Sequence, residues 1–163
     1  MSSSDIELRD VFEVATIEGA SPQEIRAWIL RIESYMKTMK QIELQVKHHF
    51  AKGLYGRELF LPKGTRAIGK IHKREHLSVI SKGAITVLTE EDGLRRIIAP
   101  YTFVSQPGTK RLVIAHTDTI WNTIHATNET DLEKIEADVI ATSYEAFDEL
   151  AFNQNLQILM GGV

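Results

Sequence analysis

The stretch GKIHKREHLSVISKGAITV, residues 69–87, decides how this chain folds. Apolar and polar residues alternate along it, and the alternation breaks at Gly83. A period of two is typical of β-strands with one buried face, and a glycine after a lysine signals a turn between two of them. Two histidines, His72 and His76, stand just before the first of these strands. The stretch therefore raises two questions: which kind of β-structure the chain forms, and whether the two histidines belong to a metal site or to another kind of pocket.

Similar runs continue on both sides of this stretch. Glycine, proline and aspartate turn signals separate them, and no helical pattern intervenes. Without helices between the strands, parallel βαβ units are excluded, which leaves an antiparallel barrel or sandwich over residues 42–127. The expected strands cover residues 42–50, 54–61, 67–72, 77–81, 84–89, 94–98, 101–105, 111–115 and 120–126.

The ends of the chain have a different pattern. Ser21, Pro22 and Glu24 predict a helix start with a capping box, and apolar residues at helical spacing extend the helix over residues 21–41. Residues 1–20 are polar and predict a flexible arm. Residues 128–163 predict a short helical tail, with one helix from Asn128 to about residue 137 and one or two further turns after Ser143.

The composition limits the class of protein. The 163 residues suit one domain, and 43% hydrophobic with 25% charged residues is ordinary for a globular protein. The net charge of −3 offers no general attraction for nucleic acid, and the absence of cysteine leaves only His, Asp or Glu as metal ligands. Neither a signal peptide nor an apolar run of membrane-spanning length is present. We therefore expect a cytoplasmic protein with no membrane partner, and we expect no nucleic-acid partner.

Two longer segments resemble a known family. PKGTRAIGKIHKREHLSVISKGAITVLTEEDG (62–93) resembles the first cupin motif, and IIAPYTFVSQPGTKRLVIAHTDTIWNTIHAT (97–127) resembles the second. The sequence is particularly similar to small cupin-domain proteins of tailed phages. The resemblance implies a mainly β protein, a cupin-type antiparallel jelly-roll barrel with an N-terminal helix and a short C-terminal helical tail. It also implies a homodimer or higher oligomer, located in the host cytoplasm or in the virion.

The same resemblance suggests which residues line the barrel. Alignment on Gly83 and Gly108 places Lys70, His72, His76 and Arg111 at the positions where metal-binding cupins have their ligands, so only one of four ligand types is retained. A cavity lined by imidazoles and cations favours an anion over a divalent metal. Tyr101 and Trp121 are the expected apolar walls.

Three functions remain open at this point. The first is a non-enzymatic phage accessory protein that binds a small anionic molecule at Lys70, His72, His76 and Arg111. The second is a metal-dependent isomerase, epimerase or oxygenase, with a divalent transition metal on His72 and His76 and a third ligand from His116, His125 or Glu75. The third is a structural virion or assembly component. Of these, the sequence favours the metal-free anion pocket.

Overall fold

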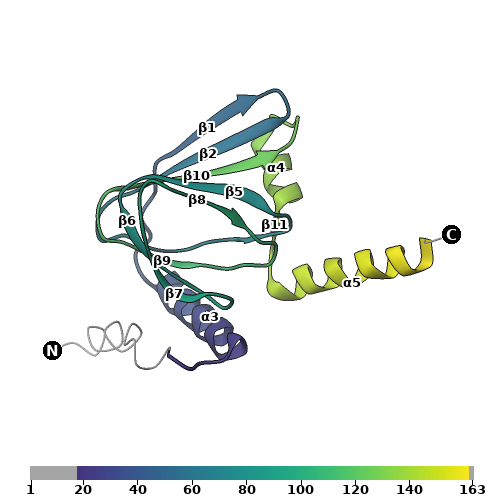
Figure 1. The fold of residues 1–163 in the computed structure, drawn as a ribbon, viewed down its shortest axis with the longest axis horizontal. Helices are drawn as coiled ribbons and strands as arrows, with labels where there is room; N and C mark the ends of the chain where they lie inside the picture. Colours follow the sequence, from purple (N-terminus) through teal and green to yellow (C-terminus); the bar gives the residue numbers. More distant parts are fainter. Residues whose placement is uncertain (1–17, 162–163) are drawn as a thin grey trace.

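The computed structural model describes residues 18–161, and its two larger antiparallel sheets face each other (Figure 1). The five-stranded sheet has the order β1 (Val46–Ala51), β2 (Leu54–Leu61), β10 (Thr119–Ala126), β5 (His76–Lys82), β8 (Tyr101–Ser105). The four-stranded sheet has the order β3 (Arg66–Ile68), β9 (Leu112–Ala115), β6 (Ala84–Thr89), β7 (Gly93–Ile98). From β5 to β10 the chain crosses repeatedly between the two sheets, with β5, β8 and β10 in one and β6, β7 and β9 in the other, as in a jelly roll. The fold class predicted from the sequence is therefore confirmed.

Alternation along each strand builds the main core between the sheets. Residues two apart on a strand share a face, and the inward face is apolar in most positions. The first strand begins at Val46 and not at residue 42, and residues 1–17 of the expected arm lie outside the described residues. The buried core residues are Leu61, Ile80, Ile85, Val87, Ile97, Val113, Ala115 and Trp121.

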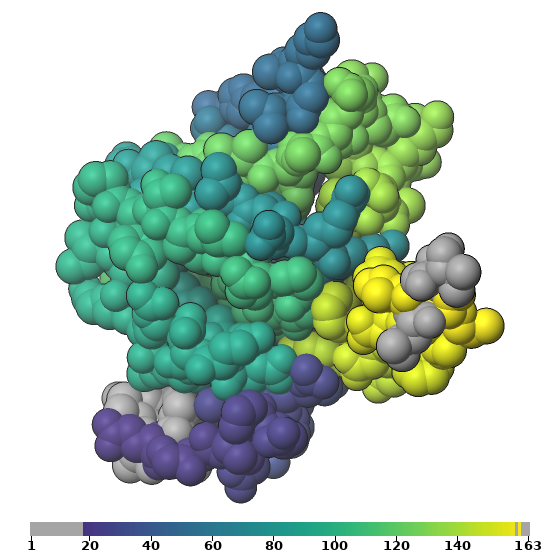
Figure 2. All heavy atoms as spheres, turned by 45° about the vertical axis from the view of Figure 1, so that its right-hand side comes forward, coloured from purple at the N-terminus to yellow at the C-terminus, as the bar shows by residue number. Residues whose placement is uncertain are grey.

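Helix α3 (Pro22–Thr38) covers the outer face of the four-stranded sheet and forms one end of the molecule (Figure 2). Its start confirms the predicted capping box: the Ser21 hydroxyl accepts a hydrogen bond from the Glu24 backbone N–H, and the Glu24 carboxylate accepts one from the Ser21 N–H. Three isoleucines at helical spacing face the sheet, where they pack on Leu88 and Leu112. These are Ile25, Ile29 and Ile32.

Replacing Ser21 by alanine is expected to lower the free energy of unfolding by about 1 kcal/mol, because the Glu24 N–H loses its partner. For a domain of this size, that corresponds to a fall in Tm of roughly 2–4 °C in thermal unfolding. Ser34→Ala on the same helix is the control, since the Ser34 hydroxyl only bonds to the Leu30 carbonyl within the helix. An equal effect of both substitutions would contradict the capping role.

The last helix of the C-terminal tail is longer than the one or two turns that the sequence pattern predicted. Helix α4 (Leu132–Val139) begins after Asp131, whose carboxylate accepts hydrogen bonds from two backbone N–H groups, and it is followed by β11 (Ile140–Ala141). Helix α5 (Tyr144–Gly161) then extends away from the barrel for 18 residues (Figure 1). Its apolar residues do not gather on one face, so periodicity gave no sign of its length. None of the helices within residues 18–161 has the length and apolarity needed to cross a membrane.

Candidate metal centre

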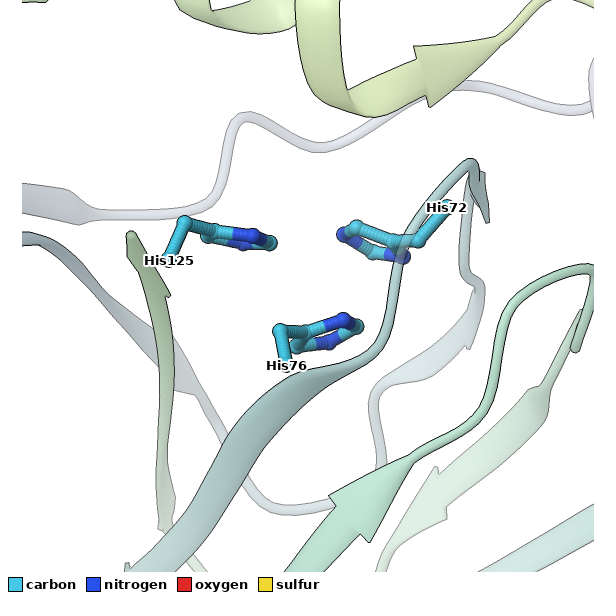
Figure 3. Close-up of side chains that lie close together, drawn as sticks. All are labelled: His72, His76 and His125. Atoms are coloured by element: carbon cyan, nitrogen blue, oxygen red, sulfur yellow. The ribbon is translucent and has the colours of Figure 1, made fainter. Parts of the chain in front are cut away.

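Three histidine side chains meet at one end of the barrel (Figure 3). His76 opens β5 and His125 lies near the end of the neighbouring strand β10, and both side chains point inward. His72 comes from β4 (Ile71–His72) and closes the group. The ring centroids lie 4.6 Å apart for His76 and His125, 4.1 Å for His72 and His76, and 5.3 Å for His72 and His125. We call these three residues the histidine triad.

His72 is positioned by the C-terminal part of the chain. Among the strands of residues 18–161, β4 pairs with β11 alone, and Ile140 lies opposite His72. The backbone on either side is also held, because the His72 carbonyl accepts a bond of 2.9 Å from the Gly108 N–H and the Lys73 N–H donates to the Val139 carbonyl at 2.8 Å. The triad is therefore complete only when β11 is in place.

Helix α4 covers this end of the barrel. Ile135 and Val139 of α4 pack on Tyr55, whose ring stacks on His125 with a centroid distance of 6.2 Å. Two ion pairs, Lys70 with Glu136 and Arg74 with Asp138, join α4 to the segment that contains His72. As a result, only 6% of His76 and 6% of His125 is exposed.

The histidine triad is neutral at physiological pH. Burial, and after it the charges of His76, His125, Arg111 and Arg57, lower the pKa of His72 to about 3. Burial is also the main cause that lowers the pKa of His125 to about 4. It lowers the pKa of His76 as well. Neutral imidazole is the form that has a free lone pair for a metal ion.

The donor atoms fit a transition metal. One nitrogen from each ring lies within 4.8 Å of the other two. Two nitrogens on a tetrahedral zinc ion, each 2.0–2.1 Å from the metal, are about 3.4 Å apart, so the rings would move together by up to roughly 1.4 Å on loading. His72 Nδ1 is buried and has no hydrogen-bond partner within residues 18–161. His76 Nδ1 lies 3.4 Å from the Arg74 carbonyl oxygen. With the ring proton on Nδ1, donated to this carbonyl, the lone pair of Nε2 is available to the metal.

Lowering the pH from 7 to 5 is expected to destabilise the metal-free protein. An unfolded histidine titrates near 6.5, so the unfolded state binds more protons than the folded state below that pH. The free energy of unfolding should therefore fall as the pH drops toward the folded pKa values, by on the order of 2 kcal/mol for His72 alone. Denaturant titrations at both pH values measure the loss. His72→Gln should make it smaller by that amount, and an unchanged loss in this variant would contradict the assignment.

A polar layer lies directly beneath the triad. On the inner face of the five-stranded sheet, Arg57 of β2 is paired with Thr123 of β10, Thr123 with Ser78 of β5, and Ser78 with Phe103 of β8. Arg111 reaches this layer from the opposite sheet, with its guanidinium 5.7 Å from the centroid of the Phe103 ring. Among residues 18–161, neither Arg57 nor Arg111 has a carboxylate within ion-pair distance. Neither guanidinium is in a salt bridge within the described part of the chain. Burial lowers the pKa of Arg111, although Glu91 and Asp92 act on its charge and raise that pKa against the effect of burial.

The structure brings some of the predicted site residues together. His72 and His76 lie in the triad, Arg111 and Tyr101 line one cavity, and Trp121 is buried in the core against Phe103. Lys70 is not brought to the triad, because its ammonium pairs with Glu136 and its side chain is 60% exposed.

Two of the three residues predicted as a possible third ligand, His116 and Glu75, do not lie in the triad. Arg57, which lies beside the triad, was not predicted. His116 is hydrogen-bonded to Thr86 at 2.7 Å, and Glu75 is not part of the triad. The sequence had offered His125 only as one of three options. Arg57 was not singled out, although its inward position follows from strand alternation in β2.

Comparison with known proteins adds a set of similar folds. No protein-family model and no curated protein matches the sequence. Among solved structures, a cupin domain from Bordetella pertussis has 17% identity and a TM-score of 0.43, covering 55% of this chain and 98% of its own. An RmlC-like cupin from Methanocaldococcus jannaschii has 14% identity and a TM-score of 0.43, covering 53% and 83%.

A third match is a Cupin 2 conserved barrel domain protein from Salinispora arenicola, with 12% identity and a TM-score of 0.42, covering 63% of this chain and 89% of its own. Each of these three structures carries the description of a cupin. The cupin-type fold assigned above rests on the strand order of the two sheets.

Proposed function

We propose that this protein binds a divalent transition metal on the histidine triad and a small anion beside the metal. The observation that supports the metal is the convergence of three neutral imidazoles, those of His76 and His125 buried and that of His72 partly buried, with one nitrogen each inside 4.8 Å. Imidazole nitrogen suits Zn²⁺, Fe²⁺, Cu²⁺ and Ni²⁺, whereas Mg²⁺ and Ca²⁺ prefer oxygen ligands. The metal-free anion pocket favoured by the sequence lacked the third histidine.

The charges around the triad support the anion. A divalent metal on neutral histidines, together with Arg57 and Arg111, would leave a strongly positive region with no described carboxylate in contact. A bound anion both completes the metal coordination and neutralises the arginines. The resemblance to phage cupin-domain proteins supports an accessory, non-enzymatic role for such binding. The cavity beside Arg111 favours ligand binding over a purely structural virion role.

Elemental analysis of the tag-free purified protein, combined with Zn²⁺ and Ni²⁺ titration of the chelator-treated protein, tests the metal. We expect one metal ion per chain, saturable, and a rise in Tm when the ion is bound. Native mass spectrometry on the same sample would also report the expected homo-oligomer and any retained small molecule. A protein that takes up no transition metal at micromolar concentration would overturn the proposal.

A second candidate function is a metal-dependent enzyme of the oxygenase or isomerase type. It is favoured by the number of ligands, because three protein ligands leave coordination positions open, as in catalytic metal sites. Loading with Fe²⁺ and adding nitric oxide would detect an open position by electron paramagnetic resonance. Absence of a nitrosyl signal in an iron-loaded sample would remove this candidate.

A further inference from the structure

A short segment near the C-terminus closes the end of the barrel over the histidine triad. It consists of α4 and β11, residues 132–141, and we call it the cover (Figure 1). Beneath the cover, His76 and His125 are each only 6% exposed, and His72 is partly buried. A hydrated metal ion reaches donors this deeply buried only when part of the surrounding structure opens.

Surface contacts attach the cover to the segment that carries His72 and His76. The side chains of both ion pairs are between 55% and 60% exposed. Ion pairs between exposed groups contribute little to stability, because water competes for both partners and salt screens their charges. The contacts are Lys70 with Glu136, Arg74 with Asp138, and the Lys73 ammonium with the Ala137 carbonyl at 2.6 Å.

The apolar part of this attachment is small. Ile135 and Val139 of the cover are 3% and 6% exposed and pack on Tyr55 of the barrel, with Ile140 partly buried against them. Strand β11 adds only two residues of pairing. The main core between the sheets contains eight buried residues, against three in this cluster. Segments with few buried apolar contacts are the ones that open locally while the rest of a protein stays folded.

The chain is held on both sides of the cover by contacts that do not involve the triad. Before it, the Thr127 N–H donates a hydrogen bond of 3.0 Å to the Gly53 carbonyl. After it, Tyr144 is 5% exposed, and the Arg26 guanidinium of α3 lies 3.9 Å from the centroid of its ring. The cover can therefore detach between two fixed points, without unfolding of the barrel or release of α5.

We propose that the cover is a gate for the metal ion, which enters and leaves when α4 and β11 detach and is trapped when they dock. This regulates the site of the proposed function and rests on that function. Docking of β11 positions His72, so the bound ion and the docked cover stabilise each other reciprocally. The exposed ion pairs of the cover then set the rate of metal release.

Release of Zn²⁺ from the loaded protein into an excess of chromophoric chelator tests the role of the ion pairs. The double variant Glu136→Gln, Asp138→Asn should release the ion about 4-fold faster than wild type at low salt, roughly 2-fold for each pair. Glu58→Gln is the control, because Glu58 pairs with Lys47 on β1 and not with the cover, and its release rate should equal that of wild type. Equal rates for wild type and the double variant would overturn the proposal.

The salt dependence of the same rate gives an independent measurement. Raising the ionic strength from about 0.01 to about 1 M shortens the Debye length from about 30 to about 3 Å. Release from wild type should accelerate to the rate of the double variant, whereas the double variant should change little. An equal acceleration of both proteins would contradict the role of the two ion pairs.

A disulfide across β4 and β11 tests whether the cover must open at all. The chain contains no cysteine, and Ile71 and Ala141 lie directly opposite each other, at a separation that suits a disulfide. Neighbouring residues of a strand point to opposite faces, so thiols introduced by Ile71→Cys and Ala141→Cys point away from the side of His72. The oxidised, Zn²⁺-loaded protein should release the ion at least about 10-fold more slowly than its reduced form, because the cover cannot detach. Equal rates would overturn the gate.

Failure of this inference and failure of the proposed function give different results. If Zn²⁺ binds and the oxidised and reduced forms release it equally, the gate is overturned and the metal proposal stands. If Zn²⁺ does not bind, the metal proposal falls, and the cover is tested in the metal-free protein by the rate at which diethyl pyrocarbonate modifies His76 and His125, followed by mass spectrometry. Faster modification in Glu136→Gln, Asp138→Asn than in wild type, with His116 unchanged as internal control, supports an opening cover, and equal rates overturn it.

Discussion

His125→Ala is expected to lower the affinity of the protein for Zn²⁺ by about 100-fold or more, because it leaves two protein ligands where a zinc site needs at least three. The ligand is lost without a change in the strand pairing of β10, since backbone hydrogen bonds hold that strand between β2 and β5. Competition with a chromophoric chelator measures the affinity. The melting temperature of the metal-free variant checks that the fold is retained.

His116→Ala is the matched control for this prediction. His116 is also a partly buried histidine of the same barrel, but its Nε2 is hydrogen-bonded to the Thr86 hydroxyl at 2.7 Å, and it is not part of the triad. Its removal should leave Zn²⁺ affinity within about threefold of wild type. Equal loss in the two variants, or wild-type affinity in His125→Ala, would place the metal elsewhere.

Gly83→Ala is expected to lower the free energy of unfolding by roughly 3 kcal/mol or more. Gly83 connects β5 to β6 with φ at +95°, a conformation that costs a residue with a side chain about 1–2 kcal/mol. A Cβ atom there would also lie 2.5 Å from the Asp118 carbonyl oxygen and 2.8 Å from the Thr119 Cα. Relief of that overlap requires backbone movement at a further cost of about 1–3 kcal/mol. Chemical denaturation measures the sum.

Gly53→Ala separates the two contributions. Gly53 has φ at +78° in the β1–β2 turn, and no atom lies within 4 Å of the position of an added Cβ. Only the conformational cost of about 1–2 kcal/mol applies there. If Gly83→Ala is as stable as Gly53→Ala, the contact of the added Cβ with residues 118 and 119 costs no stability, and the prediction is wrong.

Most of the barrel could be predicted from the sequence because its strands are long enough to show alternation. The strand expected at residues 54–61 matches β2 to the residue, and the turn at Gly83 lies where the pattern breaks. The capping box before α3 was equally clear, since it depends on residues only three positions apart. Helix α5 was underestimated, because a helix without one apolar face has no period to detect.

The candidate site was only partly predictable. His72 and His76 were selected from their spacing near a turn, but the choice of His125 as the third member depends on which strands are neighbours. Strand β11 has two residues and no pattern, so its pairing with β4 was invisible in the sequence. The same pairing explains why Lys70 is not part of the site. It brings α4, which precedes β11, next to Lys70, and Glu136 of α4 forms an ion pair with the Lys70 ammonium on the outside of the barrel.

The dependence of His72 on β11 has a consequence for the order of folding. His76 and His125 come from strands that are neighbours within one sheet, whereas His72 is paired with Ile140, which follows α4 and lies 68 residues further along the chain (140 minus 72). Contacts between distant parts of a chain carry a large loop-closure cost and tend to form late. The third ligand should therefore be absent from the folding transition state. A bound metal ion should slow unfolding strongly and leave the rate of folding almost unchanged, so that its effect is on the lifetime of the folded protein.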